Sequence, residues 1–154
     1  MKTAVLVVII SLIAARILYH EFTDPERRIE TYTTFFAEQG GRFPEVFRAQ
    51  IILESARLSS NVFKENNNLV GMRCARVRPT YCQDVNRTFA VYKHPFDSIR
   101  DYLLWQQEYL PRYERRKGIK VESTSQYIQF LCDVGYITEE EKIDYSNRLK
   151  QLIR

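Results

Sequence analysis

Apolar residues recur three and four positions apart in the stretch TDPERRIETYTTFFAEQGG, which is the spacing of one face of an α-helix. Asp24 suits the N-cap of such a helix, Pro25 suits its first position, and Gly40 suits its end. The residues expected on its buried face are Ile29, Tyr32, Phe35 and Phe36. The pattern therefore predicts a helix that starts at Pro25 and stops at Gly40.

Two further helices are predicted before residue 69. One starts at Pro44, ends near Ala56 and points Val46, Phe47, Ile51 and Leu53 inward. A short third helix begins after Ser59 or Ser60 as its cap. It stops at three consecutive asparagines, because an asparagine side chain competes for backbone groups inside a helix.

The pattern changes between Leu69 and Tyr92. The segments NLVGMRC and RTFAVYK resemble two short strands joined by a long polar connection. Helices then resume with HPFDSIRDYLLWQQEYL, whose inner face should hold Phe96, Ile99 and Leu103. The basic segment RYERRKGIKVE that follows is predicted to be a polar link.

The C-terminal third predicts two more helices. Ser123 opens the first and Gly135 stops it, while Thr138 and Glu141 have the spacing of a capping box for the second. The residues expected to anchor the last helix are Ile143, Leu149, Leu152 and Ile153. The fold class is therefore mainly α, a single helical domain over residues 24–154 with a small β-hairpin at its side.

A different pattern precedes this domain. Lys2 stands before an almost continuous apolar run from Ala4 to Tyr19, interrupted by Arg16. A positive start followed by about a dozen apolar residues is typical of a secretory signal or short anchor, and the run falls short of the roughly 20 residues of a spanning helix. We predict that residues 1–20 direct export, leaving open a cleaved signal and a membrane attachment through residues 4–19. The expected location is periplasmic, membrane-anchored or cell-wall associated.

An exported protein permits disulfides. Cys74 and Cys82 flank the predicted hairpin tip ARVRPTY, so we expect them to pair, and two short strands would gain from that restraint. Cys132 lies in an apolar helix and is expected to be a buried small side chain. With only His20 and His94 and no ligand spacing, neither a metal site nor a cofactor is expected.

The formal net charge of +4 is a weak basic bias. It is compatible with an anionic polymer as partner, but no Lys/Arg stripe is interleaved with aromatic residues, so nucleic-acid binding is not expected. Aromatic residues make up 13% of the chain, which suits a core and also a groove for sugars. We expect a monomer.

Glu54 is the candidate for chemistry. It ends an apolar helix, where burial and the negative end of the helix dipole both disfavour its charged form and should raise its pKa. A carboxyl group with a raised pKa can protonate a glycosidic oxygen near neutral pH. The alternative from position alone is a solvent-facing glutamate with no chemical role.

The segment from Glu54 to Arg73 resembles the glucosaminidases of glycoside hydrolase family 73, the flagellar and autolysin type. The positions in register with that family's pattern are Ala49, Leu53, Glu54, Ser55, Ser60, Asn67, Asn68, Leu69, Gly71, Met72 and Arg73. Weaker likenesses continue in FAVYKHPFDSIRDYLLW and GYITEEEKIDYSNRLKQLI, so the resemblance covers about residues 30–153. It implies a lysozyme-like fold with a hairpin lobe beside a cleft, and cleavage of the β-1,4 bond after N-acetylglucosamine in peptidoglycan glycan strands.

The resemblance also implies roles for individual residues. Glu54 matches the catalytic acid, Asn67 and Asn68 match the turn that shapes the cleft floor, and Tyr136 matches a tyrosine near the acid. For the asparagines a capping role, and for Tyr136 core packing, are the alternatives. Tyr92 and Trp105 are candidates for sugar stacking, with a core position as the alternative for both.

Three departures from the family pattern leave the mechanism open. Ala56-Arg57-Leu58 replaces the usual Gly-Trp-Gly, Val70 replaces the usual Phe, and the second carboxylate of the hairpin lobe has no evident match. Asp84 is the only acid between Met72 and Tyr92, so either it activates water or the substrate's 2-acetamido group acts as nucleophile. A lytic transglycosylase of the same broad fold and an inactive wall-binding module remain as alternative functions.

Overall fold

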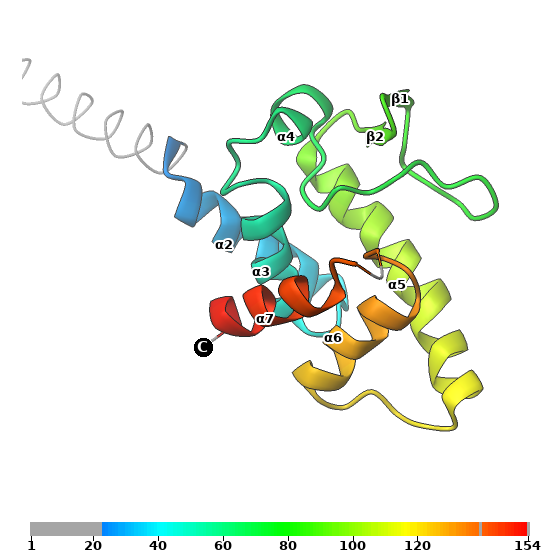
Figure 1. Ribbon diagram of the computed structural model, residues 1–154. Helices are drawn as coiled ribbons and strands as arrows, with labels where there is room; N and C mark the ends of the chain where they lie inside the picture. Colours follow the sequence, from blue (N-terminus) through cyan, green and yellow to red (C-terminus); the bar gives the residue numbers. More distant parts are fainter. Residues whose placement is uncertain (1–22, 139, 154) are drawn as a thin grey trace, which may run out of the picture.

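The computed structural model describes residues 23–138 and 140–153 (Figure 1). The predicted export segment, residues 1–20, lies outside the described residues. In the part of the chain that is described, no helix has the length and apolar character needed to cross a membrane.

The described chain is mainly helical with one two-stranded antiparallel hairpin, which confirms the predicted fold class. In chain order its elements are α2 (Pro25–Glu38), α3 (Pro44–Glu54), α4 (Asn61–Asn66), β1 (Asp84–Asn86), β2 (Phe89–Val91), α5 (Pro95–Lys117), α6 (Thr124–Asp133) and α7 (Lys142–Ile153). The hairpin and the loop before it lie on one side of α5, and α6 and α7 lie on the other side (Figure 1).

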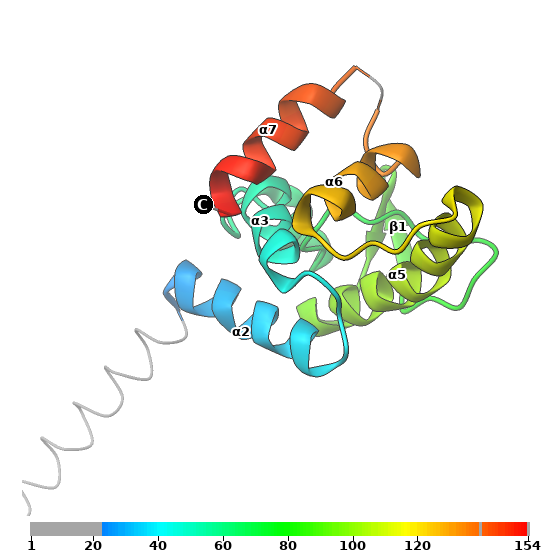
Figure 2. The same cartoon turned by 90° about the horizontal axis from the view of Figure 1, so that it is seen from below.

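Helix α3 lies at the centre of the fold, with α2 and α7 packed against it (Figure 2). The Asp24 carboxylate accepts a hydrogen bond of 3.0 Å from the Glu26 amide, as its predicted N-cap role requires. Phe36 of α2 stacks on Phe47 of α3 at 4.2 Å between ring centroids, and both rings contact Tyr102 of α5. The apolar faces predicted for α2 and α3 therefore meet in one core.

The turn that follows α3 has an unusual backbone. Ala56, Arg57 and Leu58 all have positive φ angles, between 47° and 65°. The buried Ser55 hydroxyl accepts the Leu58 amide at 2.9 Å and donates to the Ile51 carbonyl, which holds this left-handed turn in place. Each such residue carries a cost of roughly 1–2 kcal/mol that glycine would not.

We expect Ala56→Gly to stabilise the protein by about 1 kcal/mol, because the exposed Ala56 methyl makes no buried contact and glycine accepts a positive φ. Urea unfolding measures the change. The matched control is Ala37→Gly at an exposed position within α2, which should destabilise by about 1 kcal/mol. Equal destabilisation by both substitutions would contradict the strained turn.

The prediction of the first strand is wrong. β1 is formed by residues of the supposed polar connection and pairs with β2, with a turn at Arg87 whose φ is 60°. The segment expected to form the first strand instead folds over the buried Asn68 side chain, which bonds the Met72 amide and the Met72 and Ala90 carbonyls. The Ala90 amide also joins this segment to β2, by donating to the Met72 carbonyl at 2.9 Å.

Helix α5 also runs further than predicted, through most of the supposed polar link to Lys117, with Gly118 as its left-handed cap. Tertiary contacts explain the extension. Tyr113 packs edge-on against Phe130 at 5.2 Å. Glu114 accepts hydrogen bonds from the Val121 amide at 2.9 Å and the Arg42 guanidinium at 3.1 Å.

Three of the four residues expected to anchor the last helix do so, because Leu149 is buried and Leu152 and Ile153 pack against the core as partly buried side chains. Ile143, expected in the core, is 79% exposed, whereas Tyr145 and Leu149 are buried. The Thr138 hydroxyl does donate to the Glu141 carboxylate at 2.9 Å, but this contact lies in a turn ahead of α7. Tyr145 therefore takes the inward position that the sequence pattern had assigned to Ile143.

Candidate active site

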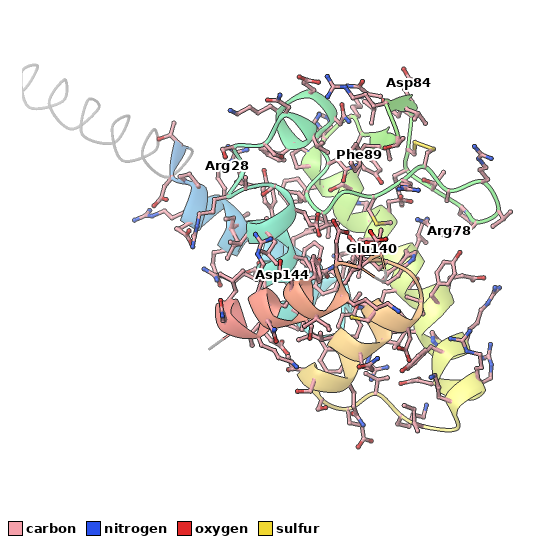
Figure 3. All side chains as sticks on the ribbon, viewed as in Figure 1. Arg28, Arg78, Asp84, Phe89, Glu140 and Asp144 are labelled. Carbon is pink, nitrogen blue, oxygen red and sulfur yellow. A yellow bond between two sulfur atoms is a disulfide. The ribbon has the colours of Figure 1, made fainter. Side chains whose placement is uncertain are left out.

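A cleft of about 710 Å³ separates the hairpin side of the molecule from α7. Its walls come from the end of α3, the loop over residues 70–75, β2, the middle of α5, and the start of α7 with the turn before it. In Figure 3, Phe89 and Arg78 lie on the hairpin side, whereas Glu140 and Asp144 lie on the opposite side.

Glu54 is the last residue of α3 and lines this cleft. Gly71 faces it from the loop opposite, because a Cβ built on Gly71 would lie 3.4 Å from the Glu54 Oε2 atom. Gly71 also has a φ of +67°, a conformation that glycine adopts at no steric cost. The close approach and the backbone conformation both explain why a glycine occupies this position.

Burial raises the pKa of the Glu54 carboxyl, and the nearby negative charge of Glu141 adds to that rise. A hydrogen bond from the Tyr145 hydroxyl and the positive charge of Arg148 act in the opposite direction, but the net shift is upward. The expected cause, burial at a helix end, is the largest contribution. A carboxyl group in this environment keeps its proton to a higher pH than a solvated glutamate does.

Tyr145 connects Glu54 to a buried polar network. Its hydroxyl is hydrogen-bonded to the Glu54 carboxylate and accepts a bond of 3.3 Å from Gln50 Nε2. The side-chain oxygen of Gln50, Oε1, accepts from the Tyr102 hydroxyl at 2.6 Å, and that hydroxyl lies 3.0 Å from the hydroxyl of Tyr127. Gln50 lies one turn before Glu54 on α3. The same helix therefore positions both Glu54 and the Gln50 side chain that holds the Tyr145 hydroxyl.

Tyr136 lies in the same cleft. Its hydroxyl donates to the Val70 carbonyl, and the charge of Glu54 helps to raise the pKa of that hydroxyl, so the two side chains are neighbours. The Trp105 ring packs edge-on against Tyr136 at 5.3 Å and stacks on Tyr109 at 5.7 Å. These three rings, with Phe89 across the cleft, provide apolar faces of the kind on which sugar rings pack.

The other proposed binding residues have structural contacts and do not line the cleft. The side-chain amide of Asn67 donates to the Tyr92 and Lys93 carbonyls at 3.0 and 3.2 Å. Asn67 also caps the end of α4 in a left-handed conformation. Asn68 holds the loop over residues 69–72, as described above. Tyr92 is buried and donates to the Asp101 carboxylate at 2.8 Å. Of the three, Asn68 holds a residue of the cleft lining, because it bonds the Met72 amide and carbonyl.

Asp84 is exposed at the start of β1, and its carboxylate accepts the Val85 amide at 2.7 Å. It does not line the cleft, and in Figure 3 it points outward from the far edge of the hairpin. The structure therefore does not bring Asp84 and Glu54 together.

Sequence reasoning missed the acids that do line the cleft, Glu141 and Asp144. With Tyr145 and Arg148 they recur three and four residues apart, which places all four on one face of the chain around α7. This helical spacing of polar residues could have predicted the cleft face of α7, but the apolar residue Ile143 indicated the opposite face instead. Within residues 23–138 and 140–153, no three His, Cys, Asp or Glu side chains are grouped to hold a metal ion.

The loop that carries the hairpin wall is tied down at two points. Cys74 and Cys82 form a disulfide, as expected. Arg78 lies between them in sequence, and its guanidinium pairs with the Asp101 carboxylate at 2.8 Å with side-chain exposures of 7% and 0%. Asp101 also accepts bonds from the Tyr81 amide and the Tyr92 hydroxyl. This wall of the cleft is thus preformed.

Comparison with known proteins identifies a family. The model of the family described as Glucosaminidase: Mannosyl-glycoprotein endo-beta-N-acetylglucosaminidase matches residues 29–154. No curated protein and no solved structure gives a significant match. The matched range contains every element from the body of α2 to the end of α7, and therefore the whole cleft.

Proposed function

The chain belongs to the glucosaminidase family of glycoside hydrolases, and we propose that it cleaves the β-1,4 bond after N-acetylglucosamine in peptidoglycan. Glu54 acts as the general acid in this proposal. The observation that carries it is the half-buried Glu54 carboxyl, whose pKa is raised, at a cleft lined with aromatic rings. The apolar segment at residues 1–20 supports export to the cell wall.

The chemistry assigned to Glu54 is a proton transfer. A glycan strand lies along the cleft with the scissile bond at Glu54, and the protonated carboxyl gives its proton to the leaving glycosidic oxygen. The bond to the anomeric carbon breaks as an oxocarbenium-like transition state forms. Tyr145 then stabilises the carboxylate that remains, because a hydrogen bond donated to the charged form favours that form.

Glu141 is our candidate for the group that activates water. It lines the cleft, is exposed, and lies near enough for its charge to raise the pKa of Glu54. A carboxyl group with a raised pKa and a second carboxyl group beside it match the acid and base pair of glycoside hydrolysis. The substrate's own 2-acetamido group is the alternative, and it would make Glu141 dispensable.

Product analysis tests the proposed function. Purified peptidoglycan is digested, the new reducing ends are reduced with borohydride, and the fragments are identified by mass spectrometry. N-acetylglucosaminitol ends are the expected result. Anhydromuramyl ends would instead identify a lytic transglycosylase, and binding to wall without soluble products would identify a wall-binding module.

We expect Tyr145→Phe to move the alkaline limb of the pH–rate profile to higher pH. The Tyr145 hydroxyl lowers the pKa of Glu54, so its removal raises that pKa further and keeps the acid protonated over a wider range. The profile of kcat/KM reports this group in the free enzyme. The control is Tyr81→Phe, at an exposed position outside the cleft, which should leave the profile in place. A downward shift in the Tyr145 variant would contradict the proposed hydrogen bond.

A further inference from the structure

A second hollow of about 540 Å³ adjoins the cleft on the hairpin side. Three arginines, Arg73, Arg76 and Arg87, line it together with Val85. The stretch from Arg73 to Ala75 lines both this hollow and the cleft, so the two are immediate neighbours. We call this second hollow the arginine groove.

The charge of the arginine groove is not neutralised by the described part of the protein. Arg73, Arg76 and Arg87 are all exposed, and no ion pair or side-chain hydrogen bond joins any of them to another described residue. Arg78, in the same loop, instead pairs with the buried Asp101 and serves the fold. Three guanidinium groups around one hollow create a local positive potential that attracts an anionic ligand.

The groove is also held in shape before any ligand arrives. The Cys74–Cys82 disulfide closes its loop, and the Arg78–Asp101 ion pair anchors the same loop to α5. A preformed site avoids the entropic cost of ordering a loop on binding. The exposed Val85 side chain and the aliphatic stems of the arginines add apolar surface to the charged rim.

We propose that the arginine groove binds the free carboxylates of the stem peptides carried by the glycan strand in the cleft. This inference rests on the proposed function, and it extends the substrate from a bare glycan to a peptide-bearing strand. Guanidinium groups bind carboxylates through paired, charge-assisted hydrogen bonds. Because the groove and the cleft share the stretch from Arg73 to Ala75, an anion in the groove lies close to the glycan strand, which favours a ligand that is covalently attached to that strand.

The test compares two forms of one substrate. Peptidoglycan freed of its phosphate-containing wall polymers is used with its stem peptides intact, or after an amidase has removed them. Wild-type protein should have a kcat/KM roughly tenfold higher on the peptide-bearing strands, as two or three partly exposed charge pairs together can supply. The double variant Arg76→Gln/Arg87→Gln should lose this preference, and Arg115→Gln, an exposed arginine at the end of α5, should keep it.

Equal cleavage of both substrates by the wild type, or an unchanged preference in the double variant, would overturn the proposal while leaving the glucosaminidase function intact. The double variant is also assayed on wall that still carries its phosphate polymers. A loss of activity confined to that substrate would assign the groove to phosphate and would also overturn the proposal. If neither substrate is cleaved, the proposed function fails separately. Calorimetry with a soluble stem peptide then decides the groove: tighter binding by wild type than by the double variant supports it, and no binding overturns it.

Discussion

Glu54→Gln should lower kcat on purified peptidoglycan by roughly 10² to 10⁴-fold, the usual contribution of a positioned general acid. Glutamine keeps the size of the side chain and fills the space opposite Gly71, but it cannot release a proton to the glycosidic oxygen. Substrate affinity should change little, because the aromatic rings of the cleft remain. Release of soluble fragments from dye-labelled wall measures the rate.

The control for this variant is Glu38→Gln, at the exposed end of α2 and outside the cleft, which should retain full activity. Glu141→Gln separates the two proposed mechanisms. A loss of about 10²-fold or more would support Glu141 as the base, whereas near-normal activity would favour the substrate's acetamido group. Wild-type activity in the Glu54→Gln variant would show that Glu54 is not the general acid.

The same Glu54 substitution should also make the folded protein more stable at neutral pH, by about 1 kcal/mol. The pKa of Glu54 is higher in the folded state than its unfolded value of 4.5, so the native state binds more protons between the two values. Wild-type stability therefore falls as the pH rises through that interval, and the variant avoids the loss. Below pH 4.5 the difference should disappear, which urea unfolding at several pH values can follow.

Asp101→Asn should destabilise the protein by about 3–5 kcal/mol, the cost of leaving a buried charge without its partner. The Arg78 guanidinium is 7% exposed and would keep its charge beside a neutral amide. The amide would also offer donors where the Tyr92 hydroxyl and the Tyr81 amide need an acceptor. Urea unfolding measures the change.

Asp97→Asn on the same helix is the matched control. It breaks the more exposed pair with Arg100, three residues away, and should cost no more than about 1 kcal/mol. Because Arg78 also lines the cleft, the Asp101 variant should lose activity at urea concentrations well below its unfolding midpoint. A change in unfolding free energy equal to that of the control would contradict the anchoring role of Asp101.

Local chemistry explains which parts of the fold could be predicted from sequence. Helix starts at Pro25, Pro44 and after Ser123 depend on caps and on proline geometry, which neighbouring residues determine. The extension of α5 depends on Glu114 meeting Arg42 and the Val121 amide, and those partners lie far away in sequence or beyond a turn. The first strand was missed for a similar reason, since the Asn68 side chain satisfies the backbone of that segment in place of a strand partner.

The same division holds in the cleft. The position of Glu54 at a helix end and its raised pKa followed from one short segment, and the motif around it identified the family. The surrounding groups come from α7, whose orientation is determined by packing Tyr145 rather than Ile143 against α3. Ile143 and Tyr145 are two positions apart on α7, but Ile143 faces solvent whereas Tyr145 contacts Glu54. The hydrophobic pattern alone did not distinguish the two residues.

To act as the general acid, the Glu54 carboxyl must still hold its proton when solvated glutamates have lost theirs. The most direct measurement is a ¹³C NMR titration of protein labelled at the glutamate side-chain carboxyls, compared with the Glu54→Gln variant. We predict one resonance, absent from the variant, whose titration midpoint lies above that of the other glutamates. A midpoint within or below the ordinary glutamate range, around 4.3, would mean an ionised carboxylate that has no proton to donate, and would contradict the claim.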